Sequence, residues 1–538
     1  MMSQKAKNYS RFVFSTAVAA LALAASSSAQ VNVLTNRYDT FRTGANPNEK
    51  VLNTANVGGP NFGKLFSYNV DGQVYAQPLV ARAYLGPKLG TKNVLFIATA
   101  HNTVYAFDAD ATSSATKPIW QINLGPSVPN RDVGSNDMSP EIGIVSTPVV
   151  DLGLQTIFVV AKTKEGGTYQ NRLHAIDITT GRPRRGSGVA IAGSVPGTGD
   201  GAQNGRVTFS SYYQMNRPGL LLLNGKIYIA FGSHGDMRPY HGWVFGYDAR
   251  TLGRTAIHCS NPNGGMGGIW QSGTGLSANA AGEIFYQSGN GSLPNEGGSL
   301  GNSFVKLGVT RDANLVVKDS FTPYDSELMN WYDLDLGTSG PIVIPGTNLV
   351  MGGGKYGGLY FVDQNNMGGY STTGNAIPQN VPAMGGHLHA APVFLRGTTE
   401  SKVFLWSEDD VLKQYTFKDG RLSNDPTSTG ALRMSWGMPG GMLSASANGT
   451  QAGSAVLWAS FPTNQNANQQ TVAGTFRAYD AMDLSKVLWS SDNDSRDDVG
   501  NFAKYVTPVV ANGRVYMASF SNKVHVYGLR ANTTAIGR

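Results

Sequence analysis

Polar side chains of several chemical types recur just after apolar, strand-like segments of the sequence. Imidazole, ammonium, amide and carboxylate groups can together bind a small polyanion. If their positions are equivalent in a ring of repeats, they meet at one axial mouth, which we expect to be polar and locally basic. The alternative is ordinary polar loops. The positions are His101, Lys162, His234, Asn290, Lys355 and Glu408, with His387 and His389 as candidates to join them.

A repeated unit must position these side chains. It returns at intervals of about 60 residues, as expected of a repeat architecture. Each unit begins with a proline before an apolar strand, where no ladder hydrogen bond is lost. A later strand ends in an aspartate that can bond the backbone of the next turn. The prolines are Pro78, Pro148, Pro341, Pro392 and Pro508, and the aspartates are Asp108, Asp177, Asp248, Asp363 and Asp480.

The repeats predict an all-β fold, an eight-bladed β-propeller. Eight units fit between Pro78 and Leu529 only if weaker copies are counted, so seven blades remain possible. A single unit cannot bury both faces of its sheet, whereas stacked blades can. The segment Phe62–Phe66 looks like an outer strand with no unit before it. We expect it to complete the last blade, around Val515–Tyr527, and so to close the ring.

The composition supports a closed all-β protein and limits its chemistry. The 67 glycines and the 14% of charged residues indicate many tight turns and a large interior. Cys259 is the only cysteine. It excludes an internal disulfide, a cysteine-based zinc cluster and a C-x-x-C-H haem attachment site. The sequence has no run of Lys and Arg, so we expect no nucleic-acid partner.

The N-terminal sequence indicates export. Lys5, Lys7 and Arg11 precede the apolar run Phe12–Ala25, which is the layout of a cleavable secretory signal. We expect cleavage near Ala29 and a secreted or periplasmic mature protein. Removal of the segment through Ala29 takes away three basic residues and no acidic ones, so the formal net charge falls from +7 to +4. No other stretch approaches the roughly 18 apolar residues of a transmembrane helix, so we predict no membrane span.

These features divide the chain into four parts. The signal and the tail flank the repeats, and an arm separates the signal from the first strand. The expected parts are a signal peptide at 1–29, an N-terminal arm at 30–61, the propeller at 62–529 and a C-terminal tail at 530–538.

Over Phe62–Leu529 the repeats resemble the PQQ-type propeller family. A narrower resemblance, to the quinoprotein alcohol dehydrogenases, rests on a few local matches. It implies that pyrroloquinoline quinone (PQQ) lies on the propeller axis above a calcium or lanthanide ion. The polar mouth would suit this tricarboxylate, with His101, Lys162, His234 and His389 among the residues that bind it.

Two local matches concern the floor of the quinone site. Phe285–Gly291 resembles the family strand that ends in a Gly-Asn turn, whose asparagine oxygen is a metal ligand, and this implies Asn290. The alternative is a tight turn in which Asn and Gly adopt left-handed backbone. Gly267–Trp270 is similar to the approach to the tryptophan under the quinone. Trp270 is therefore the candidate stacking ring, and the alternative is a core tryptophan of an outer strand.

The segment Phe321–Asp335 resembles the family segment that carries the catalytic aspartate. There one aspartate is base and metal neighbour, and a second, two residues on, completes lanthanide sites. Asp333 and Asp335 are the candidates, although one residue separates Trp331 from Asp333, which departs from the family pattern. A multivalent cation needs such hard oxygen ligands. The alternative is a polar turn that leads into the next blade.

Two further positions follow from the resemblance. Lys355 stands where the family has a cationic residue, usually arginine, near the reactive quinone carbonyl. A cation there would stabilise negative charge on the quinone oxygen, whereas the alternative is a solvated loop lysine. Glu165 lies in the loop that carries a metal-binding glutamate in the family, one residue out of step. The vicinal cysteine pair that covers the quinone in many of these dehydrogenases is missing.

These observations give one functional hypothesis and one alternative. The hypothesis is a quinoprotein-like oxidoreductase, in which Asp333 or Asp335 takes a proton from a small alcohol-type or sugar substrate beside Lys355. Asn290 and Glu165 would help to hold the ion, and an external acceptor would take the electrons. The alternative is a non-catalytic propeller that binds proteins or glycans in the envelope. The missing cysteine pair and the missing electron-acceptor domain favour this alternative.

Overall fold

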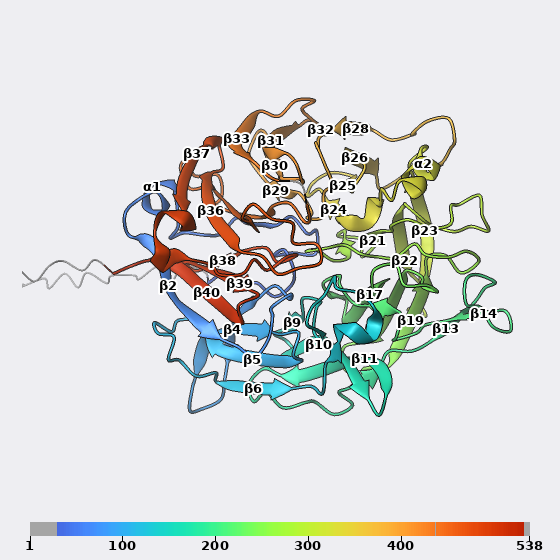
Figure 1. Cartoon of the computed structure of the whole chain (residues 1–538), viewed down its shortest axis with the longest axis horizontal. Helices are drawn as coiled ribbons and strands as arrows, with labels where there is room; N and C mark the ends of the chain where they lie inside the picture. The colour runs from blue at the N-terminus through green and yellow to red at the C-terminus, as the bar shows by residue number, and fades with distance from the viewer. Residues whose placement is uncertain (1–29, 436, 532–538) are drawn as a thin grey trace, which may run out of the picture. The chain divides into compact units, whose positions relative to one another are not determined.

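Eight mainly antiparallel sheets of four or five strands follow one another in the computed structural model, which describes residues 30–435 and 437–531. The sheets succeed each other around a ring as the blades of a β-propeller, and the colour passes around it from blue to red (Figure 1). The weaker repeats are therefore blades, and the number is eight rather than seven. The predicted signal at 1–29 and most of the predicted tail, 532–538, lie outside the described residues.

In the first four blades, most strands pair with their neighbours in the chain. Blade 1 is β3 (Leu79–Tyr84), β4 (Thr91–Ala98), β5 (Thr103–Asp108) and β6 (Trp120–Asn123). Blade 2 is β9 (Val149–Asp151), β10 (Thr156–Glu165), β11 (Thr168–Asp177) and β12 (Val189–Ala190). Blade 3 is β15 (Gln214–Met215), β16 (Leu221–Leu223), β17 (Lys226–Ser233), β18 (Trp243–Asp248) and β19 (Arg254–Cys259). Blade 4 is β20 (Ser277–Ala278), β21 (Ile284–Gln287), β22 (Phe304–Val309), β23 (Leu315–Thr322) and β27 (Gly369–Tyr370).

The last four blades follow the same plan, and two of them take a strand from the N-terminal part of the chain. Blade 5 is β24 (Ile342–Val343), β25 (Leu349–Gly353), β26 (Gly358–Asp363) and β28 (Gln379–Pro382). Blade 6 is β29 (Val393–Leu395), β30 (Ser401–Leu405), β31 (Val411–Lys418), β32 (Arg421–Leu422) and β33 (Ser428–Arg433). Blade 7 is β34 (Met442–Ser446), β35 (Val456–Pro462), β36 (Gly474–Asp480), β37 (Asp483–Ser490) and β1 (Ala45–Asn46). Blade 8 is β38 (Val509–Ala511), β39 (Arg514–Ser519), β40 (Lys523–Leu529) and β2 (Phe62–Asn69).

Short elements lie in the connections between blades. Two hairpins and several single turns of helix lie there, and one of these turns leads towards the aspartates predicted to do chemistry. They are β7 (Val128–Pro129) with β8 (Glu141–Ile142), β13 (Ser194–Pro196) with β14 (Arg206–Thr208), the helices α1 (Thr54–Val57) and α2 (Ser326–Trp331), and the 3-10 turns η1 (Asn130–Val133), η2 (Leu336–Thr338), η3 (Ser491–Asn493) and η4 (Ser495–Asp497).

The repeat motifs lie at equivalent points of the blades. Each of the five entry prolines immediately precedes the first strand of its blade. Each of the five strand-end aspartates is the last residue of its strand and accepts a hydrogen bond from the next turn. Asp177 Oδ1, for example, accepts from the backbone N–H groups of Thr179 and Thr180, each at 3.0 Å. These two predictions from the repeat are confirmed.

The last blade is completed by an N-terminal strand. β2 pairs antiparallel with β40, with Phe62 opposite Leu529, and Figure 1 shows the blue β2 beside the red β40. The ring of Phe62 lies 5.6 Å from that of Trp458 and 5.2 Å from that of Trp489, both in blade 7. The predicted closure of the ring is confirmed.

The arm that precedes β2 runs through the centre of the ring. A short segment of it exchanges hydrogen bonds with the inner edge of all eight blades, which is possible only on the axis. The bonded pairs, in blade order, are Val33 with Val80, Leu34 with Val150, Arg42 with Leu220, Thr40 with Ala278, Phe41 with Val343, Thr43 with Phe394, Gly44 with Ala445 and Tyr38 with Val510.

Arg42 is fully buried in this arm and joins two blades. Its guanidinium donates to Leu276 O at 2.9 Å, to Leu220 O at 3.0 Å and to Asn36 O at 2.7 Å. Burial lowers the pKa of Arg42 to about 10, so that the side chain keeps its charge at neutral pH. The charge is therefore solvated by backbone carbonyls of the ring instead of by water.

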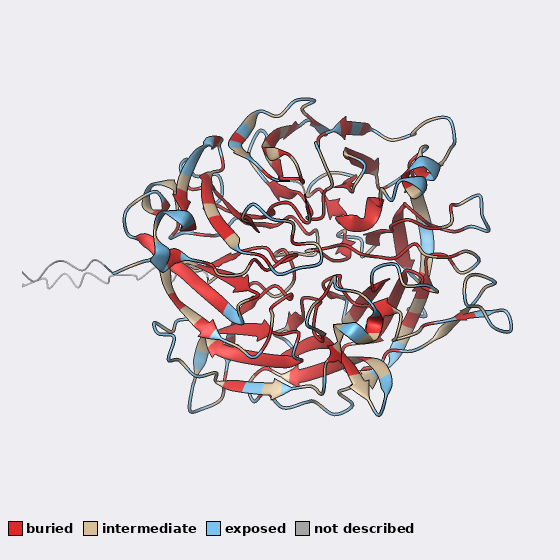
Figure 2. Cartoon of the chain, in the orientation of Figure 1, coloured by how far each residue is buried: buried red, intermediate tan, exposed pale blue. Residues whose placement is uncertain are grey.

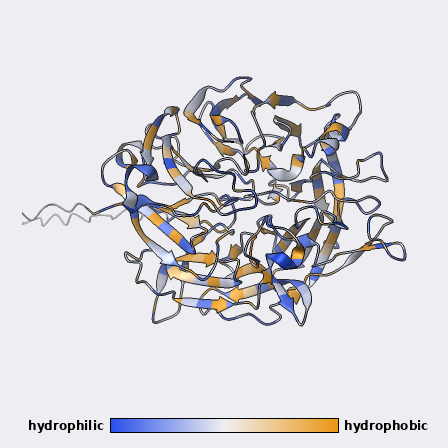
Figure 3. Ribbon diagram, viewed as in Figure 1, coloured by the Kyte–Doolittle hydropathy of each residue, from blue (hydrophilic) through white to orange (hydrophobic). Residues whose placement is uncertain are grey.

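The core lies between neighbouring blades. Buried residues fill the strands while exposed residues follow the turns and the outer rim (Figure 2), and hydrophobic residues recur along the strands (Figure 3). Phe209, for example, packs edge-on against Phe231 and Phe245, with ring centres 4.8 and 5.0 Å away. Within the described residues, no helix has the length and apolar character needed to cross a bilayer.

Candidate functional site

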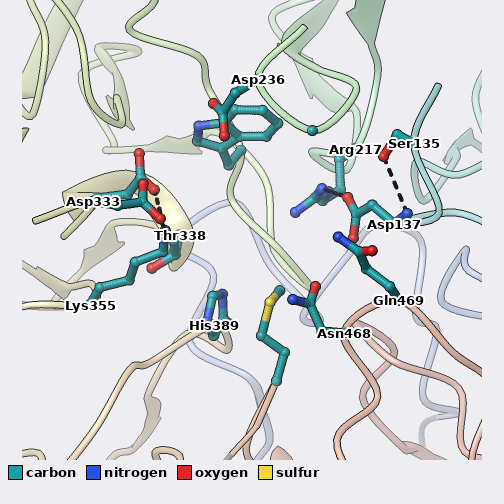
Figure 4. Close-up of a pocket in the computed structure, with 14 residues that line it drawn as sticks. Ser135, Asp137, Arg217, Asp236, Asp333, Thr338, Lys355, His389, Asn468 and Gln469 are labelled. Carbon is teal, nitrogen blue, oxygen red and sulfur yellow. Dashed lines mark hydrogen bonds and ion pairs between the residues drawn. The ribbon is translucent and has the colours of Figure 1, made fainter. Parts of the chain in front are cut away.

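Loops at one end of the ring enclose an axial pocket of about 290 Å³. Its walls come from connections between blades and from turns within blades. Five of the residues predicted from the sequence line it, and Figure 4 shows the side chains of Asp333, Lys355 and His389 among them around the same space. The lining residues are Ser135, Asp137, Arg217, Gly235, Asp236, Trp270, Asp333, Asp335, Thr338, Lys355, His389, Met438, Asn468 and Gln469.

The two predicted aspartates meet Lys355 on one wall of this pocket. Lys355 Nζ lies 2.9 Å from Asp333 Oδ2 and 2.6 Å from Asp335 Oδ2. The side chain of Asp335 is 9% exposed and that of Lys355 13%, whereas that of Asp333 is 71% exposed. The backbone N–H of Lys355 also donates to Asp335 O at 2.9 Å. One largely buried ammonium group thus bridges a buried and an exposed carboxylate.

The local backbone presents both carboxylates to the lysine. A short link joins α2 to η2, and within it Asp333 adopts a φ of 56°, in the left-handed region. The predicted ligand Asn290 holds the same link. Its side-chain amide donates to Asp333 Oδ1 at 2.9 Å, and its backbone N–H donates to Asp335 Oδ1 at 2.7 Å. The structure therefore brings Asn290 and both aspartates together.

The aspartates control the charge of Lys355. Burial by itself lowers the pKa of Lys355, but attraction by Asp335 and Asp333 outweighs it and raises the pKa above its ordinary value. The side chain therefore stays an ammonium group throughout the physiological pH range. It is a fixed positive charge at the pocket wall, not a solvated loop lysine.

The opposite wall carries an aromatic and ionic cluster. The Arg217 guanidinium is ion-paired with Asp137 and lies 5.4 Å from the ring centre of Trp270 and 4.8 Å from that of Tyr505. Lys504 Nζ is 3.6 Å from Asp137 Oδ1. Burial tends to raise the pKa of Asp137, but Arg217 and Lys504 outweigh it and lower the pKa. Figure 4 shows Arg217 and Asp137 across the pocket from Asp333 and Lys355.

Trp270 lies in the connection between β19 and β20, not in an outer strand. Glycines leave room for its ring, because a Cβ at Gly232 or Gly289 would lie 2.8 or 2.7 Å from a ring atom. The indole Nε1 is buried and has no hydrogen-bond acceptor among the described residues. The pocket wall therefore includes an aromatic ring, whose N–H is buried.

Asp236 is a pocket carboxylate that the sequence analysis missed. Tyr240 Oη donates to Asp236 Oδ1 at 2.6 Å. Burial is the main reason why the pKa of Asp236 is raised, and the neighbouring charges of Asp335 and Asp333 raise it further. The only signal in the sequence was the density of aromatic and imidazole groups in this stretch, which does not single out the aspartate.

The pocket is acidic, whereas the recurring polar positions predicted a basic mouth. Among the described lining residues, four aspartates face two basic side chains, a formal excess of two negative charges. Two of the expected basic groups are buried outside the lining, where Lys162 Nζ contacts His234 Nε2 at 2.6 Å and donates to Gln214 O at 2.9 Å. Burial lowers the pKa of Lys162 to about 7.

Glu165 and His101 are not among the pocket residues. Arg172, on the neighbouring strand of the same hairpin, binds both oxygens of Glu165 at 2.7 and 2.6 Å. This hydrogen bonding is the main reason why the pKa of Glu165 is lowered to about 2. His101 Nδ1 lies 3.0 Å from Glu141 Oε2. The structure gives each of these side chains a local partner instead of a place at the pocket.

The carboxylates beside Lys355 are the type of ligand that a hard cation prefers. Asp333 and Asp335 supply carboxylate oxygens there, and the excess of negative charge favours a multivalent ion. Asn290 directs nitrogen donors at both aspartates, and its side-chain oxygen, the predicted ligand atom, accepts from Asn302 Nδ2 at 2.8 Å instead. Calcium and lanthanide sites need six or more oxygen ligands. Without Glu165, further oxygens must come from water or from the molecule bound in the pocket.

Comparisons with known proteins show the fold. No known family profile matches the chain, and a search of curated proteins gives no match. Solved structures match at 12 to 15% identity.

Three of these structures cover almost the whole chain. Quinohemoprotein alcohol dehydrogenase ADHIIG from Pseudomonas putida HK5 has a TM-score of 0.54 and 15% identity, with 93% of this chain and 80% of that chain covered. The quinohemoprotein alcohol dehydrogenase from Comamonas testosteroni gives 0.54 and 15%, with 95% and 83% covered. A europium-containing methanol dehydrogenase gives 0.58 and 12%, with 93% and 98% covered. The chain therefore shares the β-propeller fold of these dehydrogenases.

Proposed function

We propose that the chain is a secreted or periplasmic oxidoreductase that oxidises a small alcohol or sugar with PQQ bound in the axial pocket. The observation that carries this proposal is the Lys355 ammonium group held between Asp333 and Asp335 at the pocket wall. It sets a proton acceptor beside a fixed positive charge. The likeness in fold to quinoprotein dehydrogenases supports the proposal but does not carry it.

The pocket residues fit a flat polyanion that binds together with a hard cation. Trp270 offers a flat ring, and Arg217 and Lys355 place positive charge on opposite walls. Asp333 and Asp335 would hold a calcium or lanthanide ion, which offsets the negative excess of the lining. When bound, PQQ supplies the hydride acceptor, and an external acceptor would afterwards take the electrons.

Asp333 is the candidate base. Its side chain is 71% exposed, so that a substrate hydroxyl can reach it. One oxygen is bonded to Lys355 and the other to Asn290, and this fixes the direction of the carboxylate. A proton would pass from the substrate hydroxyl to Asp333 while Lys355 stabilises negative charge on a neighbouring oxygen. Asp335, which is buried, positions Lys355.

A titration of the purified protein with PQQ tests this function. We expect saturable PQQ binding that requires calcium or europium, and quinone absorbance measures it. We also expect the loaded protein to oxidise alcohols in a dye-linked assay. Asp333→Asn should lower turnover by about 100-fold or more, because it removes the proton acceptor. Lys355→Met should weaken quinone binding as well as turnover. Glu165→Gln is the matched control, since Arg172 holds that carboxylate outside the pocket lining. Absence of saturable binding under every metal condition would contradict the proposal.

A binding scaffold is the second candidate, and a surface patch favours it. Large apolar side chains on and beside α2 are exposed to solvent, which is typical of an interaction surface. We name these residues the α2 patch, and they are Tyr324, Leu328, Trp331, Tyr332 and Tyr356. If the chain is a scaffold, Trp331→Ser should reduce its binding of an envelope protein or glycan, and PQQ should not bind.

A further inference from the structure

We infer that His387, His389 and Glu408 form a second metal site, which binds a divalent transition ion such as Zn²⁺ at the edge of the axial pocket. One ligand atom from each residue lies within 4.8 Å of the other two. His389 also lines the pocket. The inference does not rest on the proposed quinone chemistry, because its donors differ from the aspartate wall and it needs no quinone.

Two loops hold the three side chains in place. The histidines stand two positions apart between β28 and β29, and Glu408 follows β30. The backbone N–H of Glu408 donates to His387 O at 3.0 Å, which joins the two loops. Leu388, between the histidines, accepts a hydrogen bond from Thr338 Oγ1 at 2.8 Å. The cluster is therefore assembled by backbone contacts before any ion binds, next to the loop that carries the aspartates.

The spacing of the donor atoms suits one ion. His389 Nε2 lies 3.0 Å from Glu408 Oε1, and His387 Nδ1 lies 4.0 Å from Glu408 Oε2. Ligands of a single zinc ion at about 2.0 to 2.2 Å lie roughly 3 to 4 Å from each other. The donors therefore need only small side-chain movements to reach a common centre.

Two of these donor atoms are buried without a hydrogen bond. The side chains of His389 and Glu408 are each 2% exposed. Although 3.0 Å apart, His389 Nε2 and Glu408 Oε1 lack the geometry of a hydrogen bond, and neither has another partner among the described residues. A buried carboxylate oxygen that accepts no hydrogen bond costs free energy. A bound cation removes this cost, because it accepts one lone pair from His389 Nε2 and one from Glu408 Oε1.

The donor set selects the class of metal. Two imidazoles with one carboxylate suit zinc and other first-row divalent ions, whereas calcium prefers oxygen ligands alone. Three protein ligands leave coordination positions free for solvent or for a bound molecule, as in catalytic zinc sites. Since His389 lines the pocket, we expect the free position to face it. The proposed ion would thus act on molecules in the axial pocket.

Cobalt and zinc binding by the full chain tests the site. After chelation and dialysis, Co²⁺ should give visible ligand-field bands, and calorimetry with Zn²⁺ should show one saturable site that depends on His389. His389→Ala and Glu408→Gln should each weaken Zn²⁺ binding by about 100-fold or more and abolish the cobalt bands. His101→Ala is the control, because that imidazole is paired with Glu141 outside the pocket lining.

A second comparison separates this site from the aspartate wall. Asp333→Asn should leave Zn²⁺ and Co²⁺ binding unchanged, whatever it does to calcium or to PQQ. If His389→Ala fails to fold, as judged by circular dichroism, the half-buried His387→Ala carries the test. If the wild-type protein lacks a saturable site, or if these variants bind Zn²⁺ as the wild type does, the inference is wrong and His389 and Glu408 are a buried ion pair.

Discussion

At the residue scale, two lysines that the repeat predicts at equivalent positions have opposite electrostatic environments, and the structure places Lys162 within β10 and Lys355 in the turn between β25 and β26. Two carboxylates surround Lys355 and raise its pKa, although burial acts against them. Lys162 is buried among neutral acceptors, namely Ser211 O at 2.7 Å, Gln214 O at 2.9 Å and His234 Nε2 at 2.6 Å. Burial lowers its pKa to about 7. The partners, and not the position in the repeat, decide whether a lysine is a permanent charge.

We expect Lys162 to make the protein more stable as the pH rises from about 7 to about 9. In this window the unfolded chain keeps the lysine proton while the folded protein has lost it, so the unfolded state binds more protons and the free energy of unfolding increases with pH. Below pH 7 both states are protonated and this contribution to the slope vanishes. The slope from one group cannot exceed about 1.4 kcal/mol per pH unit.

Urea unfolding at several pH values measures this effect. Lys162→Met should remove the part of the slope that the lysine causes, because no proton can then be exchanged at that position. Lys117→Met is the control, since Lys117 is exposed and its variant should follow the wild type. An undiminished slope in Lys162→Met would show that the lysine remains charged in the folded protein.

At the scale of elements, the N-terminal arm supplies hydrogen-bond partners to the inner strands of the blades, as β2 does to β40 at the outer edge of blade 8. Inner strands at the centre of a propeller have backbone groups that face the axis, and buried backbone groups require partners. The arm supplies such partners for all eight blades. Val33, for example, bonds Val80 of blade 1, and Tyr38 Oη accepts from Val510 N–H of blade 8. Arg217 lines both the pocket and the small cavity beside Asn36. The arm therefore also lies behind the floor of the pocket.

Arg42→Met should lower the free energy of unfolding by about 3 kcal/mol or more. The arginine donates charged hydrogen bonds to Leu220 O, Leu276 O and Asn36 O, and each such bond contributes about 1.5 to 3 kcal/mol. Methionine fills similar volume but leaves three buried carbonyls without this donor. Urea unfolding measures the loss. Arg311→Met, in an exposed turn, should be neutral. Equal stability of both variants would mean that the arm contributes little.

At the scale of the whole molecule, the sequence predicts the ring better than the pocket. Proline entries, strand-end aspartates and the extra strand at Phe62 are local signals, and each depends on a few neighbouring residues. Short local motifs also predict Trp270 and Lys355, and both lie on the pocket wall. Glu165 also follows a local pattern, but Arg172 across the hairpin decides its role.

The rest of the site arises only when distant loops meet. Asp236 and Arg217 have no motif of their own. Both come from loops of blade 3, and the ring brings them to the same pocket as Lys355 of blade 5. The acidity of the pocket is likewise a sum over loops. The axial arm shows the same limit, since its hydrogen bonds go to backbone carbonyls and N–H groups, which every sequence has.

Phe62→Ala should weaken the whole ring and not only one blade. Phe62 is 2% exposed and packs against Trp458 and Trp489, so that β2 ties blade 8 to blade 7 as well as to the start of the chain. Loss of a buried phenylalanine costs about 3 to 5 kcal/mol. Because each blade is supported by its neighbours, we expect circular dichroism and tryptophan fluorescence to report one coincident unfolding transition at lower urea. Leu89→Ala, at a side chain 44% exposed, should change little. Separate transitions in Phe62→Ala would mean that blades unfold independently, and that β2 closes the ring without making it cooperative.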